Sequence, residues 1–177
     1  RAELAADGAG LSDACGHKSA ASGGHDWGGA IAWATALLEP QVVERLVVLN
    51  CPHPAIFPKA LLSNPAQLRR SWYVFFFQLP FLPEWAFLRR DAELIGKVFD
   101  SAMSPDVFSD EERRAYRDAA LKPGAMRAAL NYYRAATRFR ALGPADRKIA
   151  APTMLIWGEE DQALGKELTE GMEPLFS

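Results

Sequence analysis

The sequence predicts an α/β protein in which a partial parallel β-sheet is interrupted by a helical insertion. Three observations indicate this class. A glycine-rich turn at 23–28 opens a helical pattern, short apolar strand patterns lie at 45–50 and 153–157, and a succession of helical patterns fills 55–145 between them. The order turn–helix–strand, helices, strand–turn–helix is typical of a sheet with helices inserted between two of its strands.

Length and composition limit the function classes. The chain has 177 residues, enough for one ordinary domain, and its net charge of −2 predicts no general attraction to nucleic acid or anionic membranes. Cys15 and Cys51 show no metal-ligand spacing and form no disulfide framework, so we expect a reducing compartment. The start RAELAADGAG has no basic region followed by an apolar run, so we expect no signal peptide and a cytoplasmic location. The aromatic run at 73–88 is interrupted by polar residues and prolines, which predicts no membrane segment.

The first elements follow from local patterns. Residues 1–22 are rich in Ala, Gly and Ser without periodicity, so we expect an irregular start that is not native to the fold. Small and apolar residues at 28–38 predict a buried helix that ends before Pro40. The β-branched run at 45–50 predicts a buried parallel strand, which the two prolines of the following CPHP segment terminate.

The later elements are mostly helical. Asn64 before Pro65 and Ser109 before an acidic turn both predict helix starts. Residues 125–139 predict another helix after Pro123-Gly124, and 165–176 follow the last strand with a further helical pattern. We therefore expect three regions after the irregular start: core segments at 23–54 and 146–177, and a helical block at 55–145.

The turn at Gly24-His25-Asp26-Trp27-Gly28 has the pattern small–x–nucleophile–x–small of a nucleophile elbow. Such a turn raises Asp26 above the backbone and directs the next N–H, that of Trp27, toward the reacting group. A carboxylate is already ionised at neutral pH and forms an alkyl ester with an alkyl carbon, which suits epoxides and alkyl halides. It does not suit serine-esterase chemistry. A plain helix N-cap is the competing interpretation of Asp26, and the residues alone leave both open.

Five segments together resemble the soluble epoxide hydrolases of the α/β-hydrolase superfamily, over about residues 23–174. The resemblance implies a core sheet with an inserted helical cap, to which 55–145 corresponds. It also implies a small apolar epoxide and water as reactants, and no cofactor or metal. The segments, in order, are GHDWGGAIAW, VERLVVLNCPHP, RSWYVFFFQLPFLPEW, NYYR and PTMLIWGEED.

The resemblance also implies roles for individual residues. Asp26 corresponds to the nucleophile, and Tyr73 and Tyr133 to cap tyrosines whose hydroxyls bind the epoxide oxygen. That oxygen leaves poorly unless it receives a proton or a strong hydrogen bond. Asp161 in GEED corresponds to the acid that orients a catalytic histidine, and the Trp27 N–H to an oxyanion donor. Without the resemblance, each tyrosine would be a half-buried core residue and Asp161 part of an acidic turn.

The sequence also departs from the family's pattern. The family places a histidine after the acid, and none of His17, His25 and His53 occupies that position. The strands that precede the elbow in the family are also missing, and the segment before Gly23 is polar. We therefore expect this chain to be an internal fragment. A substrate would alkylate its Asp26 at most once, and the ester would not be hydrolysed. A haloalkane dehalogenase, which shares the aspartate elbow with a following tryptophan, and a non-catalytic fragment or pseudoenzyme are the alternatives.

Overall fold

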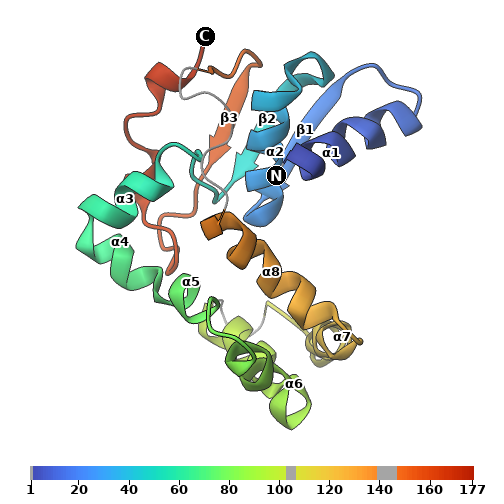
Figure 1. The fold of residues 1–177 in the computed structure, drawn as a ribbon, viewed down its shortest axis with the longest axis vertical. Coiled ribbons are helices and arrows are strands. Elements are labelled where there is room, and N and C mark those ends of the chain that lie inside the picture. Colours follow the sequence, from blue (N-terminus) through green and yellow to red (C-terminus); the bar gives the residue numbers. More distant parts are fainter. Residues whose placement is uncertain (1, 103–106, 139–146) are drawn as a thin grey trace. The chain divides into compact units, whose positions relative to one another are not determined.

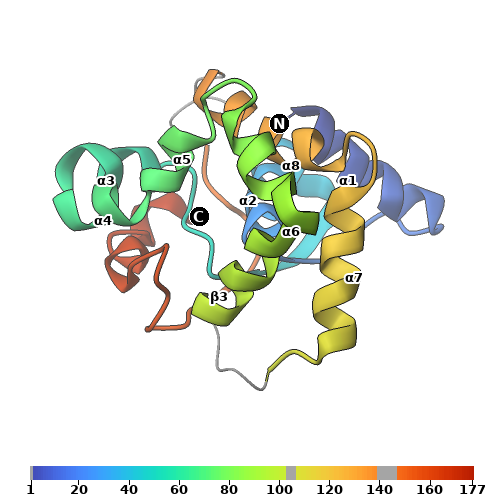
Figure 2. The ribbon, with the colours of Figure 1, turned by 90° about the horizontal axis from the view of Figure 1, so that it is seen from below.

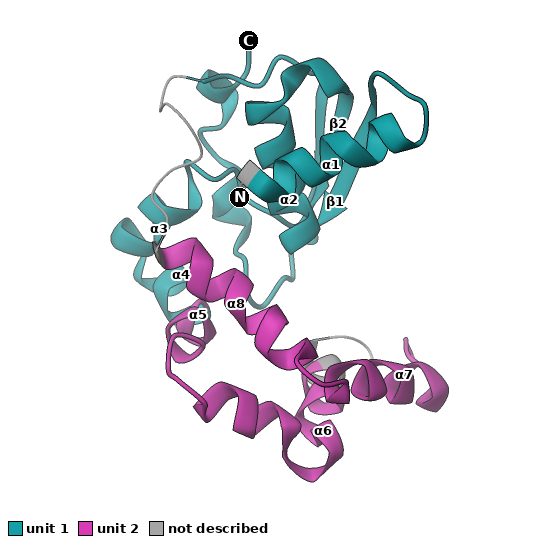
Figure 3. Ribbon diagram, turned by 45° about the vertical axis from the view of Figure 1, so that its right-hand side comes forward, with its two compact units in different colours: residues 1–70, 141–177 teal, residues 71–140 magenta. Residues whose placement is uncertain are grey.

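A computed structural model describes residues 2–102, 107–138 and 147–177. The chain forms two compact units. The sheet unit comprises residues 1–70 and 141–177, and the helical unit comprises residues 71–140 (Figure 3). The helical unit is therefore inserted in the sequence of the sheet unit, as the α/β pattern predicts.

The sheet unit contains three parallel strands in the order β1–β2–β3 (Figure 1). They are β1 (Ala20–His25), β2 (Val43–Leu49) and β3 (Thr153–Ile156). In the register, His25 pairs with Leu49 and Leu49 with Ile156, so the three strands end at one level. The residues that follow them therefore share one edge of the sheet. This arrangement confirms the partial parallel sheet and both strands expected from the sequence.

Helix α2 (Trp27–Leu38) packs on one face of this sheet and confirms the helix expected at 28–38. Its Trp33 is fully buried among the strand residues Leu46 and Val48. The indole Nε1 of Trp33 donates to the Cys51 carbonyl at 3.1 Å. Burial of the large ring supplies apolar stabilisation, while this bond satisfies its single polar atom. The helix that carries the elbow is thereby fixed to the central strand.

The expectation of an irregular start at 1–22 is wrong. Residues Ala2–Ala14 form helix α1, and β1 begins at Ala20. Alanine has the highest helix propensity, and α1 buries Ala5 completely. At Gly8 an added Cβ would lie 3.2 Å from Oγ1 of Thr35, which shows how closely α1 approaches α2. The strand before the elbow thus exists in spite of its polar sequence, because its small residues allow α2 to pack against it.

Two short helices and three 3₁₀ turns are the other elements of the sheet unit among its described residues. Asn64 caps α4 as expected, since its Oδ1 accepts the N–H groups of Ala66 and Gln67 at 3.0 and 3.1 Å. The expectation of a helix at 165–176 is wrong, because the segment forms two short 3₁₀ turns. Gly171 adopts a φ of +67° between these turns, and Pro174 follows it. The elements are α3 (Phe57–Ser63), α4 (Pro65–Arg70), η1 (Pro40–Val42), η2 (Lys166–Thr169) and η3 (Glu173–Leu175). Figure 2 shows α3 and α4 beside the C-terminal segment.

The helical unit contains α5 (Trp72–Phe76), α6 (Leu82–Ala102), α7 (Asp110–Leu121) and α8 (Ala125–Arg138). Helix α6 is interrupted at Arg89–Ala92, where residues 90 to 92 have positive φ. Ser109 starts α7 with a full capping box, as expected from its sequence. Helix α8 matches the helix expected at 125–139 up to Arg138, and residue 139 lies outside the described residues. In the described part of the chain, no helix is long and apolar enough to cross a membrane.

The two compact units meet in the sequence at residues 70/71 and 140/141. The expected core and cap segments meet at 54/55 and 145/146, so α3 and α4 belong to the sheet unit although the expectation assigns them to the cap segment. The two compact units follow from contacts within this chain, whereas a cap is defined by comparison with a family. The expected boundaries of the cap at 54/55 and 145/146 therefore remain a prediction.

Candidate active site

Asp26 occupies the tight turn between β1 and α2. Its backbone has φ 51° and ψ −119°, a conformation that is strained for a residue with a side chain. Its N–H donates to the Leu49 carbonyl at 3.3 Å, which ties the turn to the central strand. Within the described residues, the Asp26 side chain makes no capping bond to α2. Because this capping bond is absent, a simple helix cap does not account for Asp26, and the residue is exposed.

Two glycines allow this turn to form. A Cβ on Gly24 would lie 2.3 Å from the carbonyl carbon and oxygen of Gly28, so strand and helix backbones touch there. A Cβ on Gly29 would lie 2.6 Å from the Cβ of Cys51. By contrast, apart from its chain neighbours and the backbone of its own helix, no described atom lies within 4 Å of a Cβ built on Gly28. The elbow therefore needs glycine at 24 and 29, because a side chain there would collide with its neighbours. At position 28 of the motif, there is room for a Cβ.

The surroundings of Asp26 combine a negative charge with a buried thiol. Burial raises the pKa of the Cys51 thiol to about 12, and the nearby Asp26 carboxylate adds to this rise. Cys51 therefore stays protonated and is no competing nucleophile at neutral pH. Trp27 is the first residue of α2, so its backbone N–H lies at the positive end of the helix.

Asp161 lies in the loop after β3 and is held by three hydrogen bonds. Its Oδ1 accepts the N–H groups of Ala163 and Leu164 at 2.8 and 2.9 Å. Its Oδ2 accepts from Nδ2 of Asn50 at 2.6 Å. The side chain is half-buried, so these bonds replace part of the water that a carboxylate would otherwise bind. The structure thus gives Asp161 a fixed orientation at the edge where Asp26 also lies.

The loop that carries Asp161 is also tied to α4. The buried Gln67 donates through Nε2 to the Ala163 carbonyl at 2.8 Å and accepts the Gly165 N–H at 2.9 Å. Arg70 on the same helix forms an ion pair with Glu167 at 3.0 Å. A buried side-chain amide with both ends bonded specifies one conformation for the loop it joins.

In the helical unit, the structure brings Tyr73 and Tyr133 together. Their ring centroids are 5.9 Å apart with an interplanar angle of 82°, and Phe77 packs edge-on against both rings. Tyr73 lies on α5 and Tyr133 on α8, and both side chains are half-buried. Residues 60 positions apart in the sequence thus form one aromatic cluster, which is the pairing that the resemblance implies.

Arg134 fixes the position of α8 beside α5 and was assigned no role from the sequence. Its guanidinium binds both carboxylate oxygens of Glu84, at 2.6 and 3.0 Å, and donates to the carbonyls of Phe77 and Leu79. Both side chains are about 85% buried, and the hydrogen bonds from Arg134 hold the pKa of Glu84 below its usual range. The sequence signal for this structural role is that Arg134 belongs to the NYYR segment.

The histidines do not complete the site. His53 is buried edge-on against Trp33, and burial lowers its pKa to about 4. Its Nδ1 accepts the Ala55 N–H at 3.1 Å. His25 ends β1 and is exposed, and His17 is exposed in the loop before β1. His53 therefore serves the packing of the sheet unit.

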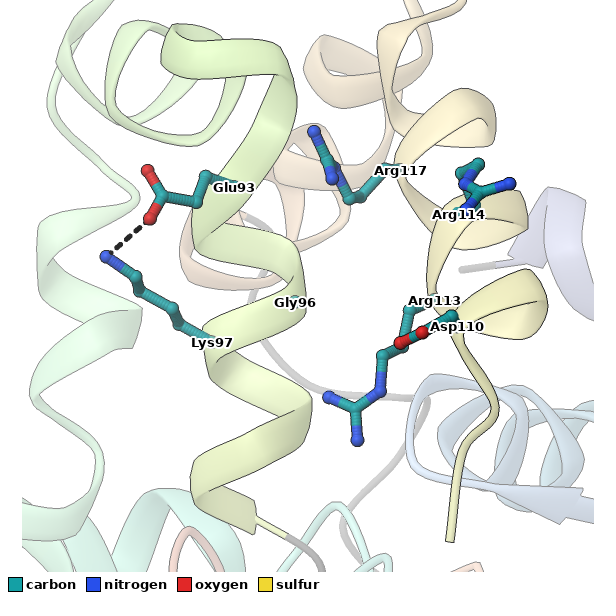
Figure 4. A pocket seen from close by; sticks show the side chains of 7 residues that line it. All are labelled: Glu93, Gly96, Lys97, Asp110, Arg113, Arg114 and Arg117. Carbon is teal, nitrogen blue, oxygen red and sulfur yellow. Dashed lines mark ion pairs between the residues drawn. The ribbon is translucent and has the colours of Figure 1, made fainter. Parts of the chain in front are cut away.

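A cavity of about 300 Å³ lies in the helical unit between α6 and α7. Figure 4 shows that charged side chains surround it, with Lys97 and Glu93 paired on α6 and three arginines on α7. None of the predicted site residues lines this cavity. Among the described residues, no group of three or more His, Cys, Asp or Glu side chains is arranged to hold a metal ion.

The geometry of the elbow agrees with comparisons to known proteins. A family model described as the alpha/beta hydrolase fold matches residues 2–176. The chain belongs to the α/β-hydrolase fold family. It is also similar to epoxide hydrolase 4 of Mus musculus, 36% identical over 172 residues, and to epoxide hydrolase 3 of Xenopus tropicalis, 39% identical over 155 residues. These matches confirm the resemblance to epoxide hydrolases.

The matches cover this α/β-hydrolase chain nearly completely but only part of each relative. The mouse match covers 94% of this chain and 47% of the mouse protein, and the frog match covers 85% and 42%. The chain thus spans about half the length of the curated relatives it matches. The solved structure of Bacillus megaterium epoxide hydrolase with an inhibitor superimposes with a TM-score of 0.85 at 25% identity, covering 97% of this chain and 63% of that one.

Proposed function

We propose that this chain belongs to an epoxide hydrolase, which opens an epoxide to a vicinal diol through an alkyl ester of Asp26. The observation that carries the proposal is the Asp26 turn itself. The carboxylate is exposed on a strained elbow, at the amino end of α2, and does not cap that helix. A strained residue that is held by its surroundings is a feature of functional sites.

In the first step, one Asp26 carboxylate oxygen attacks an epoxide carbon and the ring C–O bond breaks. The electron pair of that bond goes to the epoxide oxygen. We propose that Tyr73 and Tyr133 donate hydrogen bonds to this oxygen, and that one of them supplies the proton of the new alcohol. The clustering of the two rings within 5.9 Å supports a shared target for their hydroxyls.

In the second step, water attacks the carbonyl carbon of the Asp26 ester, and the Trp27 N–H stabilises the oxyanion that forms. The oxyanion then collapses, the bond between the carbonyl carbon and the alkyl oxygen breaks, and the diol leaves with a proton returned by the base. The water must lose a proton to a base. We propose that Asp161 orients a histidine for this purpose, a role supported by its place after β3 and by its fixed carboxylate. The histidines of this chain do not match that position, so the first step is the one to test on this chain.

The first step is tested by incubating the chain with styrene oxide and following adducts by mass spectrometry. Cys15 is an exposed free thiol that also reacts with epoxides, so the test uses a Cys15→Ser variant. We expect one adduct that hydroxylamine removes, because an ester is cleaved and a thioether is not. The matched control is Asp26→Asn, which is isosteric, tolerates a positive φ and loses no capping bond. A folded chain without the adduct would support a non-catalytic fragment instead.

The tyrosines are tested in the same assay. Tyr73→Phe and Tyr133→Phe retain the ring contacts with Phe77 and remove only the hydroxyl groups. We expect each variant to slow adduct formation by roughly tenfold or more, as the loss of one acid catalyst does. Tyr132→Phe, at the exposed neighbour of Tyr133, is the control.

The haloalkane dehalogenase is distinguished by its product. An alkyl bromide would then alkylate Asp26 with release of bromide, and the two tyrosine variants would not alter the rate. We expect the epoxide to react faster than the bromide, because the clustered tyrosines serve an oxygen leaving group.

A further inference from the structure

The loop after β2 holds a polar side chain that the proposed mechanism has not used. Asn50 follows β2 directly, at the carboxyl edge of the sheet and between the strands that lead to Asp26 and Asp161. Its backbone N–H donates to the Ile156 carbonyl at 3.0 Å, and the carbonyl of its neighbour Leu49 accepts the Asp26 N–H. The backbone of Asn50 is therefore fixed to β3 directly, and its neighbour Leu49 is fixed to the Asp26 turn.

The side-chain amide of Asn50 makes two bonds to the segment that carries the acid. Its Oδ1 accepts the Gly158 N–H at 2.9 Å, and its Nδ2 donates to Oδ2 of Asp161 at 2.6 Å. The orientation of the amide is unambiguous, because the backbone N–H can only donate and the carboxylate can only accept. Asn50 has a φ of +40°, which asparagine tolerates better than most residues.

Among the described residues, the hydrogen bonds to the Asp161 carboxylate leave one of its acceptor positions unused. Each carboxylate oxygen can accept two hydrogen bonds. Both positions on Oδ1 are taken by the N–H groups of Ala163 and Leu164, and one on Oδ2 is taken by Asn50. The remaining position on Oδ2 is where an imidazole N–H can bind.

We propose that Asn50 is a positioning residue for the hydrolytic step: it holds the Asp161 carboxylate so that the second lone pair of Oδ2 receives the histidine. The inference rests on the proposed function, because it assumes the role of Asp161 in that step. It predicts that loss of the Asn50 donor affects release of the Asp26 ester through the base. Formation of the ester does not involve Asp161.

The test uses the Cys15→Ser chain, alkylated with styrene oxide and then freed of reagent. Imidazole is added as the base, and loss of the Asp26 adduct is followed by mass spectrometry. We expect imidazole to accelerate release in the parent chain. Asn50→Gly removes both side-chain bonds without backbone strain, and we expect it to reduce the imidazole-dependent rate by roughly tenfold, as loss of one bond to a charged group does. Circular dichroism checks that each variant is folded.

Asn50→Asp separates positioning from simple loop support. It retains an acceptor for the Gly158 N–H but replaces the donor to Asp161 with a second carboxylate. We expect slow release at pH 8 and recovery relative to the parent chain as the pH falls toward 6, where the two carboxylates share a proton. Loop support alone predicts parent-like release at every pH.

The outcomes separate the two proposals. If the parent chain forms no adduct, the proposed function is wrong and this inference with it. If the adduct forms but imidazole has no effect on the parent chain, or the Asn50 variants release it as the parent does, only the positioning role is wrong.

Discussion

The close contact of strand and helix at Gly24 makes a substitution there the sharpest test of the elbow. In Gly24→Ala, the new Cβ would lie 2.3 Å from the carbonyl carbon and oxygen of Gly28 and 2.7 Å from the Gly29 nitrogen. All three atoms belong to backbone, so no side-chain rotation relieves the contact. The end of β1 and the start of α2 must move apart instead.

The required movement sets the size of the effect. Nonbonded carbon atoms prefer separations of about 3.5–4 Å, so the two backbones must separate by about 1 Å. Overpacking that side chains can absorb typically costs about 1–3 kcal/mol. Since backbone must move here, we expect the free energy of unfolding to fall by about 3 kcal/mol or more, a large share of the roughly 5–15 kcal/mol of an ordinary domain. Alkylation of Asp26 should fall with it.

Gly28→Ala is the matched control four residues along the same motif. Apart from chain neighbours and the backbone of α2 itself, no described atom lies within 4 Å of its new Cβ, and alanine is preferred over glycine in a helix by about 0.5–1 kcal/mol. We expect this variant to unfold at the same or slightly higher urea concentration than the parent chain. Urea titrations followed by far-ultraviolet circular dichroism compare the two. Equal midpoints for Gly24→Ala and Gly28→Ala would refute the packing account of the elbow.

Three further predictions concern the parts that support the site. Burial lowers the pKa of His53 to about 4, so the unfolded chain binds a proton on this residue more readily than the folded chain does. The contribution of His53 to stability is therefore present above about pH 6.5 and is lost as the pH falls toward 4. Urea titrations should show the free energy of unfolding falling by about 2 kcal/mol from pH 7.5 to 5.0, and His53→Asn should abolish this decrease. The pKa of Glu84 is lowered by hydrogen bonds from Arg134, so its contribution is present above about pH 4.3 and lost as the pH falls further; Glu84→Gln should lower the urea midpoint at pH 7 and flatten its decline below pH 4.3. Ser109→Ala removes the N-cap of α7 and should cost about 1 kcal/mol in the same titration at neutral pH, whereas a parent-like midpoint would contradict the capping contact.

The sequence predicted those parts of the fold that depend on local pattern. The β-branched run of β2 and the small residues of α2 determine their own elements, and the elbow motif places Asp26 directly before α2. The sequence did not predict β1, because the segment AASGGH has no strand pattern. That strand forms because glycine at 24 admits the helix backbone, a packing requirement that is visible only once both elements are in place.

Long-range bonds explain what was missed at the site. Asn50 and Asp161 are separated by 111 positions, and Arg134 and Glu84 by 50. No periodicity or spacing rule connects residues so far apart. Tyr73 and Tyr133 were paired in advance only through a resemblance, and their catalytic roles remain a prediction.

The most direct measurement of the central claim is to locate the styrene oxide adduct by peptide sequencing in a mass spectrometer. The account predicts an ester on Asp26 in the peptide that contains GGHDWGGA, absent from Asp26→Asn and removed by hydroxylamine. An adduct confined to other residues, or equal labelling of the Asp26→Asn chain, would contradict the assignment of Asp26 as the nucleophile.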